Sequence, residues 1–170
     1  MAVTPGRRYS WRMFVALRAV AYATAFIGLL LVFLPGRVLA WSGIVRPAAL
    51  GPLELAGLAL AALGGGLALW CIAAFALIGK GTPAPFDPPR TLVIRGPYRY
   101  VRNPMYLGAA LALGGAALFY RSLPLLGYTA LFLLITHLFV LVYEEPALRR
   151  LFGDDYAAYS TRVSRWLPRR

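Results

Sequence analysis

Residues 104 to 143 read PMYLGAALALGGAALFYRSLPLLGYTALFLLITHLFVLVY. Two apolar stretches in this segment, Pro104 to Tyr120 and Leu123 to Tyr143, approach or reach the roughly 20 residues that a helix needs to cross a bilayer. Arg121 and Ser122 alone separate them. The pattern therefore predicts two membrane-spanning helices that are joined as a tight hairpin.

Two further apolar stretches precede this segment, Met13 to Leu34 and Leu53 to Gly79, with a Gly- and Pro-rich outer loop from Pro35 to Pro52 between them. The chain of 170 residues is 60% hydrophobic and 14% charged, which is outside the usual composition of soluble domains. We expect one all-α integral membrane domain with about four transmembrane helices. Residues 1–79 form a two-span anchor, and residues 80–170 hold a cytoplasmic loop, the hairpin and a C-terminal tail.

The basic residues are distributed along the chain in a pattern that indicates its membrane topology. The formal net charge is +12, and most of the basic residues lie in residues 7–12, 80–102 and 149–170. With four spans these segments lie on one side of the membrane, which the positive-inside rule assigns to the cytoplasm. We therefore expect a multi-pass protein of a bacterial inner or plasma membrane, with both termini cytoplasmic. Its basic face contacts lipid head groups and not nucleic acid.

Two polar segments interrupt the apolar sequence, Arg95 to Gly108 and Glu144 to Pro168. In the first, Asn103 followed by Pro104 is the pattern of a helix N-cap and a first helical residue. The N-terminus of that helix faces the cytoplasm, where its free N–H groups favour an anion. Arg102 and several tyrosines lie beside it, which suits an anionic or zwitterionic ligand or an interfacial anchor.

The second polar segment contains an acidic pair that calls for a cation. Glu144 and Glu145 lie at the C-terminal end of a span, where a negative charge opposes the helix dipole. His137 lies seven residues earlier and is either a functional group or a neutral histidine bonded to a neighbouring helix. Gly153 divides the following tail into two short amphipathic helices across the cytoplasmic mouth of the bundle. A lone Cys71 excludes a disulfide framework and a cysteine-based metal site, and no metal is expected.

These segments resemble the isoprenylcysteine carboxyl methyltransferase family and its relatives, the phospholipid methyltransferases, over about residues 80 to 168. The resemblance is carried by Gly-Pro-Tyr at 96–98, Arg-Asn-Pro-x-Tyr-x-Gly at 102–108, the acidic pair and the tail residues up to Pro168. It implies an S-adenosylmethionine site formed by the cytoplasmic loop and the tail, and lined by Thr91, Leu92, Val93, Tyr98, Asn103, Pro104, Met105, Tyr106 and Glu145. It also implies catalytic roles for Glu144, Arg102 and Arg162.

Under this resemblance Glu144 pairs with the ammonium of the cofactor or with the acceptor, while Arg102 or Arg162 orients an anionic acceptor group. The expected activity is methyl transfer to a lipophilic acceptor at the cytoplasmic face, as in the isoprenylcysteine enzymes. The family commonly has His at the position of Asn103, and the prenylcysteine enzymes have Arg at that of Val140. Phospholipid, thiol or amine acceptors, a nicotinamide-dependent reductase and a non-catalytic scaffold that binds anionic lipid are the alternatives.

Overall fold

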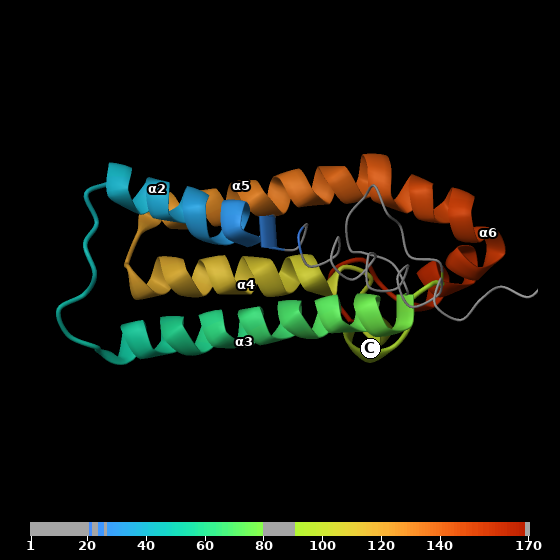
Figure 1. Cartoon of the computed structure of the whole chain (residues 1–170), viewed down its shortest axis with the longest axis horizontal. Helices are drawn as coiled ribbons and strands as arrows, with labels where there is room; N and C mark the ends of the chain where they lie inside the picture. The colour runs from blue at the N-terminus through green and yellow to red at the C-terminus, as the bar shows by residue number, and fades with distance from the viewer. Residues whose placement is uncertain (1–20, 22–23, 26, 80–90, 169–170) are drawn as a thin grey trace, which may run out of the picture.

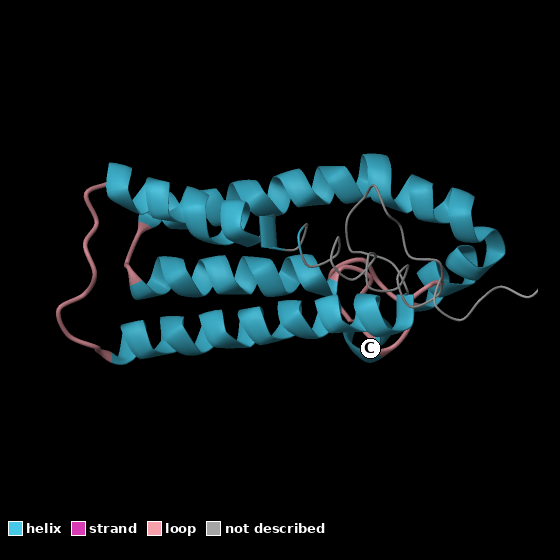
Figure 2. Cartoon of the chain, viewed as in Figure 1, coloured by secondary structure: helices cyan, strands magenta, loops and turns pink. Residues whose placement is uncertain are grey.

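The protein is helical throughout the part that the structure describes. The structure is a computed structural model and describes residues 21, 24–25, 27–79 and 91–168. Every regular element in these residues is a helix or a helical turn, which confirms the predicted all-α class (Figure 2). In chain order they are the π-helical turn η1 (Gly28–Phe33), α2 (Leu34–Trp41), α3 (Pro52–Ala74), the π-helical turn η2 (Phe75–Gly79), the 3₁₀ turn η3 (Gly96–Arg99), α4 (Pro104–Phe119), α5 (Leu123–Phe139), the π-helical turn η4 (Val140–Glu144) and α6 (Glu145–Arg162).

Two of these helices have the length and apolar composition needed to cross a membrane. One is Pro52–Gly79, which joins α3 to η2, and the other is Leu123–Arg162, which joins α5, η4 and α6. The shorter apolar helices Gly28–Trp41 and Pro104–Phe119 lie beside them (Figure 1). This architecture is compatible with a membrane protein, and the number of spans and their orientation stay predictions.

The predicted ends of the first span differ from the structure. Most of the stretch from Met13 to Leu34 lies outside the described residues. Its helix continues through Pro35 to Trp41, so the prediction that the outer loop starts at Pro35 was wrong. Pro35 has no N–H to donate and follows the π-helical turn η1 directly. The hydrogen-bond ladder is already irregular there, which lets the helix accommodate the proline.

Backbone contact through glycines joins α3 to α4. A Cβ atom on Gly57 would lie 2.6 Å from the backbone N of Phe119, and one on Gly64 would lie 2.4 Å from that of Ala112. Gly108 and Gly115 of α4 approach the backbone of α3 as closely. Small residues permit this approach between apolar helices, for which burial alone gives no driving force inside lipid. The sequence pointed to Gly64–Gly66, and of these three glycines Gly64 makes the contact while the other two face open space.

The turn between α4 and α5 is short, which confirms the predicted hairpin. An ion pair closes the bundle at this turn. The Nε atom of Arg121, in this turn, donates to Oε1 of Glu54 at 2.6 Å. The other carboxylate oxygen, Oε2, accepts from the backbone N–H of Gly51 at 2.9 Å. Glu54 thus caps the start of α3, as expected for a carboxylate at a helix N-terminus. It also ties α3 to the hairpin.

The opposite end of the bundle is covered by α6 and the residues that follow it (Figure 1). Gly153 has φ 49° and ψ −122°, a backbone conformation that L side chains rarely adopt, and it bends α6 into two halves. The predicted division of the tail at Gly153 is therefore confirmed. Beyond the bend, Tyr156, Tyr159 and Val163 are buried in one cluster.

Candidate functional site

The loop before α4 brings the first polar segment to the covered end of the bundle. Asn103 precedes α4 directly and Pro104 occupies its first turn, as predicted. The Asn103 side chain makes no capping bond to α4. Its Nδ2 atom donates to the backbone carbonyl of Arg165 at 3.3 Å. The residue that starts α4 is thus also bonded to the C-terminal segment.

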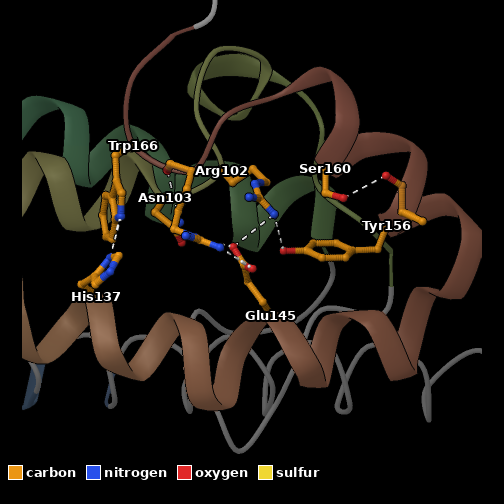
Figure 3. Close-up of polar contacts among 9 residues, drawn as sticks. Arg102, Asn103, His137, Glu145, Tyr156, Ser160 and Trp166 are labelled. Atoms are coloured by element: carbon orange, nitrogen blue, oxygen red, sulfur yellow. Dashed lines mark hydrogen bonds and ion pairs between the residues drawn. The ribbon is translucent and has the colours of Figure 1, made fainter.

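Glu145 is the centre of the ionic network in this site (Figure 3). Nε and Nη2 of Arg165 donate to its two carboxylate oxygens at 2.8 and 2.9 Å, which is a bidentate pair. Nη1 of Arg102 lies 3.1 Å from Oε1 of the same carboxylate. The side chains of Glu145, Arg102 and Arg165 are 9%, 11% and 29% exposed. The hydrogen bonds to Glu145 raise the pKa of Arg165. Glu145, Arg102 and Arg165 together form an ionic triad.

Arg102 also contacts the tail and keeps one donor without a partner. Its Nη1 atom donates to the hydroxyl of Tyr156 at 3.2 Å. Its backbone N–H donates to the carbonyl of Ser164 at 2.9 Å, next to an isolated parallel bridge between Val101 and Ser164. Its Nε atom is buried and has no hydrogen-bond acceptor among the described residues. A buried donor of this kind costs free energy unless a ligand supplies the acceptor.

Glu144 differs from its neighbour in its partners, since no basic side chain of the described residues pairs with it. The hydroxyl of Tyr106 on α4 donates to its Oε2 atom at 3.1 Å. Within residues 27–79 and 91–168, no arginine, lysine or histidine forms an ion pair with this carboxylate. A carboxylate held away from water without a cation is unfavourable. Glu144 is therefore suited to bind a cationic group or to accept a proton.

The π-helical turn η4 determines which face of the long helix each residue of the acidic pair occupies. In an α-helix one face recurs every three or four residues, whereas the backbone N–H of Glu145 here bonds to the carbonyl five residues earlier, that of Val140. The buried face of this long helix follows the same five-residue step at its end, through Leu125, Thr129, Phe132, Thr136, Val140 and Glu145. Glu145 thus stays on the buried face.

Tyr98 connects the loop before α4 with the tail. Its ring packs edge-to-face on Phe75, with the centroids 5.3 Å apart. Its backbone carbonyl accepts from the hydroxyl of Tyr159 at 2.7 Å. Burial, together with the nearby Cys71 thiol and the negative charge of Glu144, holds the pKa of Tyr98 well above its usual range. Tyr98 is therefore a neutral phenol close to the acidic pair.

The structure gathers most of the residues that the sequence singled out, though not all. Val93, Tyr98 and Met105 pack against one buried cluster, and Leu92 packs against the cluster of tail tyrosines. Thr91 is exposed and donates to the carbonyl of Ile78 at 2.9 Å.

Arg162 is placed differently from the expectation, since it is exposed and makes none of the polar contacts of the site. The arginine of the tail that enters the ionic network is Arg165, three residues later. Tyr156 and Trp166 also enter the site, and their helical spacing and position in the tail were the signals available in the sequence. The described residues contain no group of three or more His, Cys, Asp or Glu that could hold a metal ion.

Comparisons with known proteins agree with this arrangement. A model of the phospholipid methyltransferase family matches residues 53–155, which include α3, α4, α5 and the acidic pair. Methanethiol S-methyltransferase 1 of Bradyrhizobium diazoefficiens is 34% identical over 96 residues. That alignment covers 54% of this chain and 30% of the relative, so less than a third of the relative is matched. No solved structure matches the chain.

Proposed function

Because this chain belongs to the phospholipid methyltransferase family, whose model matches more than half of it, we propose that it transfers a methyl group from S-adenosylmethionine to an acceptor at the membrane. The observation that carries this proposal is a complementary pair of groups in one site. Among the residues that the structure describes, Glu144 is a carboxylate without a cation, and Arg102 has a buried Nε–H without an acceptor. A zwitterion satisfies both.

The amino-acid part of S-adenosylmethionine is such a zwitterion. In this proposal Glu144 binds its ammonium group, and Nε of Arg102, with the N-terminus of α4, binds its carboxylate. Glu145 keeps the Arg102 side chain in place and compensates part of its charge. When bound, the cofactor supplies a methyl group on a sulfonium, so the protein needs no nucleophile of its own. Its residues orient the reactants and exclude water.

The acceptor is the less defined part of the reaction. An isoprenylcysteine carboxylate, suggested by the resemblance, needs a cation close to Glu144. Val140 is fully buried at the position where the prenylcysteine enzymes have arginine. Arg102 and Arg165 are both bonded to Glu145. These contacts favour a neutral acceptor.

A thiol or an amine is such an acceptor, and it enters from the apolar side of α4 and α5. Its proton leaves as the new bond to carbon forms, and a lone pair of the Glu144 carboxylate that the cofactor ammonium does not use accepts it. A thiol is supported further by the name of the relative that shares 34% identity, methanethiol S-methyltransferase 1. A phospholipid amine is the equivalent choice if the acceptor is a membrane lipid.

The cofactor site is tested by varying the ligand and the protein together. S-adenosylhomocysteine and methylthioadenosine share the adenosine group, and the second lacks the amino-acid part. Calorimetry on the detergent-purified chain should give saturable one-site binding, about tenfold or more tighter for S-adenosylhomocysteine, since each charge-assisted hydrogen bond contributes roughly 1.5–3 kcal/mol.

The variant Glu144→Gln should reduce this preference between the two ligands, while Asp154→Asn, which removes an exposed carboxylate, should preserve it. Equal binding of both ligands would contradict the assigned zwitterion site. No saturable binding to the folded wild type would favour a scaffold that binds anionic lipid, an interaction that weakens steeply with salt.

The acceptor class is tested with methyl-labelled cofactor and matched apolar compounds that carry a carboxylate, a thiol or an amine. The neutral-acceptor proposal expects label in the thiol or the amine product, and rates that fall in Glu144→Gln. Label in the carboxyl ester of a prenylcysteine alone would overturn it and restore the isoprenylcysteine assignment.

A further inference from the structure

A histidine of the long helix is bonded to a tryptophan that follows α6. Nε1 of Trp166 donates to Nδ1 of His137 at 2.9 Å, and the ring centroids are 5.9 Å apart (Figure 3). Trp166 also packs against the apolar cluster of α4 and α5 that contains Tyr106 and Leu113. His137 is the single histidine of the chain, so its chemistry can be observed without overlap.

This hydrogen bond fixes the form of the His137 ring. An indole N–H only donates, so Nδ1 of His137 must be the acceptor. The imidazole is therefore neutral and its proton lies on Nε2. While this bond is intact, Nδ1 is not free to take a proton from an acceptor. This removes one of the alternatives that the sequence left open for His137 and leaves Glu144 as the base.

Trp166 matters because of the residue that precedes it. Arg165 holds Glu145 through its guanidinium, and its carbonyl accepts from Asn103. On the helical side, His137 lies eight residues before Glu145, a rise of about 12 Å at 1.5 Å per residue. The ion pair of Arg165 and the indole of Trp166 therefore attach the tail to two well-separated points of one long helix.

We propose that Trp166 and His137 are positioning residues of the cofactor site. Their hydrogen bond fixes the backbone of the tail at Arg165, which orients Glu145, which in turn orients Arg102 toward the bound anion. The inference rests on the proposed function, because it assigns Arg102 to the carboxylate of the cofactor. Neither Trp166 nor His137 contacts the reacting groups in this scheme.

Substitutions that preserve packing separate this role from a merely structural one. Trp166→Phe keeps an aromatic ring in the apolar cluster and removes the N–H donor. His137→Gln keeps a side-chain acceptor, whereas His137→Leu does not. Trp41→Phe is the matched control, since Trp41 is 89% exposed and lies at the far end of the bundle.

The ¹⁵N spectrum of protein labelled in its single histidine reports whether Nδ1 accepts a hydrogen bond, and it is recorded on the wild type, Trp166→Phe and Trp41→Phe. The calorimetric affinity for S-adenosylhomocysteine and the melting temperature are measured on every detergent-purified variant. Trp166→Phe should lose the Nδ1 signature, and both Trp166→Phe and His137→Leu should bind about three- to tenfold more weakly, with melting temperatures close to the wild type. His137→Gln should restore affinity, and Trp41→Phe should change nothing.

The outcomes distinguish this inference from the function beneath it. Wild-type affinity in Trp166→Phe, with the Nδ1 signature lost, would overturn the positioning role and leave the methyltransferase proposal intact. A wild-type chain that binds no S-adenosylhomocysteine would overturn the proposed function, and the positioning role with it. A wild-type spectrum without an accepting Nδ1 would overturn the hydrogen bond itself.

Discussion

Each end of the bundle has a buried carboxylate bonded to arginine, and the two arrangements differ in what they join. Glu54 is 3% exposed and pairs with Arg121, whose side chain is 64% exposed. Glu145 pairs with both Arg102 and Arg165, which are largely buried. The first pair joins two segments, the start of α3 and the turn after α4, which lie 67 positions apart. The second joins three segments and, among the described residues, leaves one buried donor, Nε of Arg102, without an acceptor.

The comparison teaches that a buried ion pair alone does not indicate a site. At the Glu54 end both oxygens of the carboxylate have hydrogen-bond partners, and backbone contacts through Gly57 and Gly115 hold the helices. At the opposite end side chains hold the segments together, and Nε of Arg102 has no acceptor among the described residues. Binding capacity of this kind, which Nε of Arg102 and the carboxylate of Glu144 provide, is what indicates a site.

The largest effect is expected for Glu145→Gln. This change leaves Arg102 and Arg165 side by side with no carboxylate between them, and breaking a buried ionic network in this way costs about 3 kcal/mol or more. Unfolding in detergent followed by circular dichroism should show the loss. Binding of S-adenosylhomocysteine should disappear in calorimetry. Wild-type stability and affinity together would show that the triad organises nothing.

The next largest effect is expected at the glycine contact between α3 and α4, near Glu54. Gly57→Ala places a Cβ atom within 3 Å of the α4 backbone, and overpacking of this kind costs about 1–3 kcal/mol. Gly65→Ala is the control, because nothing lies within 4 Å of its Cβ position. The first variant should melt earlier and still bind the cofactor, since the contact is far from the triad. Equal stability of the two variants would contradict the close approach.

A smaller effect is expected for Tyr159→Phe. This substitution removes the hydrogen bond from the Tyr159 hydroxyl to the carbonyl of Tyr98 and leaves the ring in its cluster. A hydrogen bond of this type contributes about 1 kcal/mol. Melting in detergent should show a modest fall, and the affinity for S-adenosylhomocysteine should fall with it because the tail is attached less firmly. A lower melting point with unchanged affinity would mean that this contact belongs to the fold alone.

The smallest effect is expected for Glu54→Gln. The amide oxygen of glutamine can still accept from the Gly51 N–H or from Arg121. The Arg121 side chain is largely exposed, so it loses little when the carboxylate is removed. The melting temperature should fall slightly and cofactor affinity should be unchanged. A loss of affinity here would erase the distinction between the two ends.

Much of the fold could be predicted because it depends on local patterns. Apolar stretches placed α3, α4 and α5, an Asn-Pro pair placed the start of α4, and Gly153 placed the bend of α6. The contact through Gly57 and Gly115 was missed because these glycines lie 58 positions apart and only packing brings them together. No residue type marks η4, since a π-helical turn follows from the fit between distant helices.

The site shows the same division between local and tertiary information. The sequence identified Arg102 and the acidic pair by type and position, and family membership supports a methyltransferase. It did not determine that, within the described part of the chain, Glu145 pairs with both Arg102 and Arg165 while Glu144 pairs with no arginine. It also favoured Arg162 over Arg165, because the spacing of two arginines in an amphipathic tail does not decide which one faces the bundle.

The bridge between Arg102 and the tail also bears on the order in which the protein is made. Glu145 emerges from the ribosome 43 residues after Arg102, and Arg165 follows 20 residues later. Until that last segment is synthesised, the acidic pair and Arg102 lack the partner that fixes them. Contacts between segments so far apart form late, because the entropy cost of closing the chain between them comes before the contacts stabilise the fold. The proposed cofactor site is therefore complete only after α6 and the segment that follows it have been made.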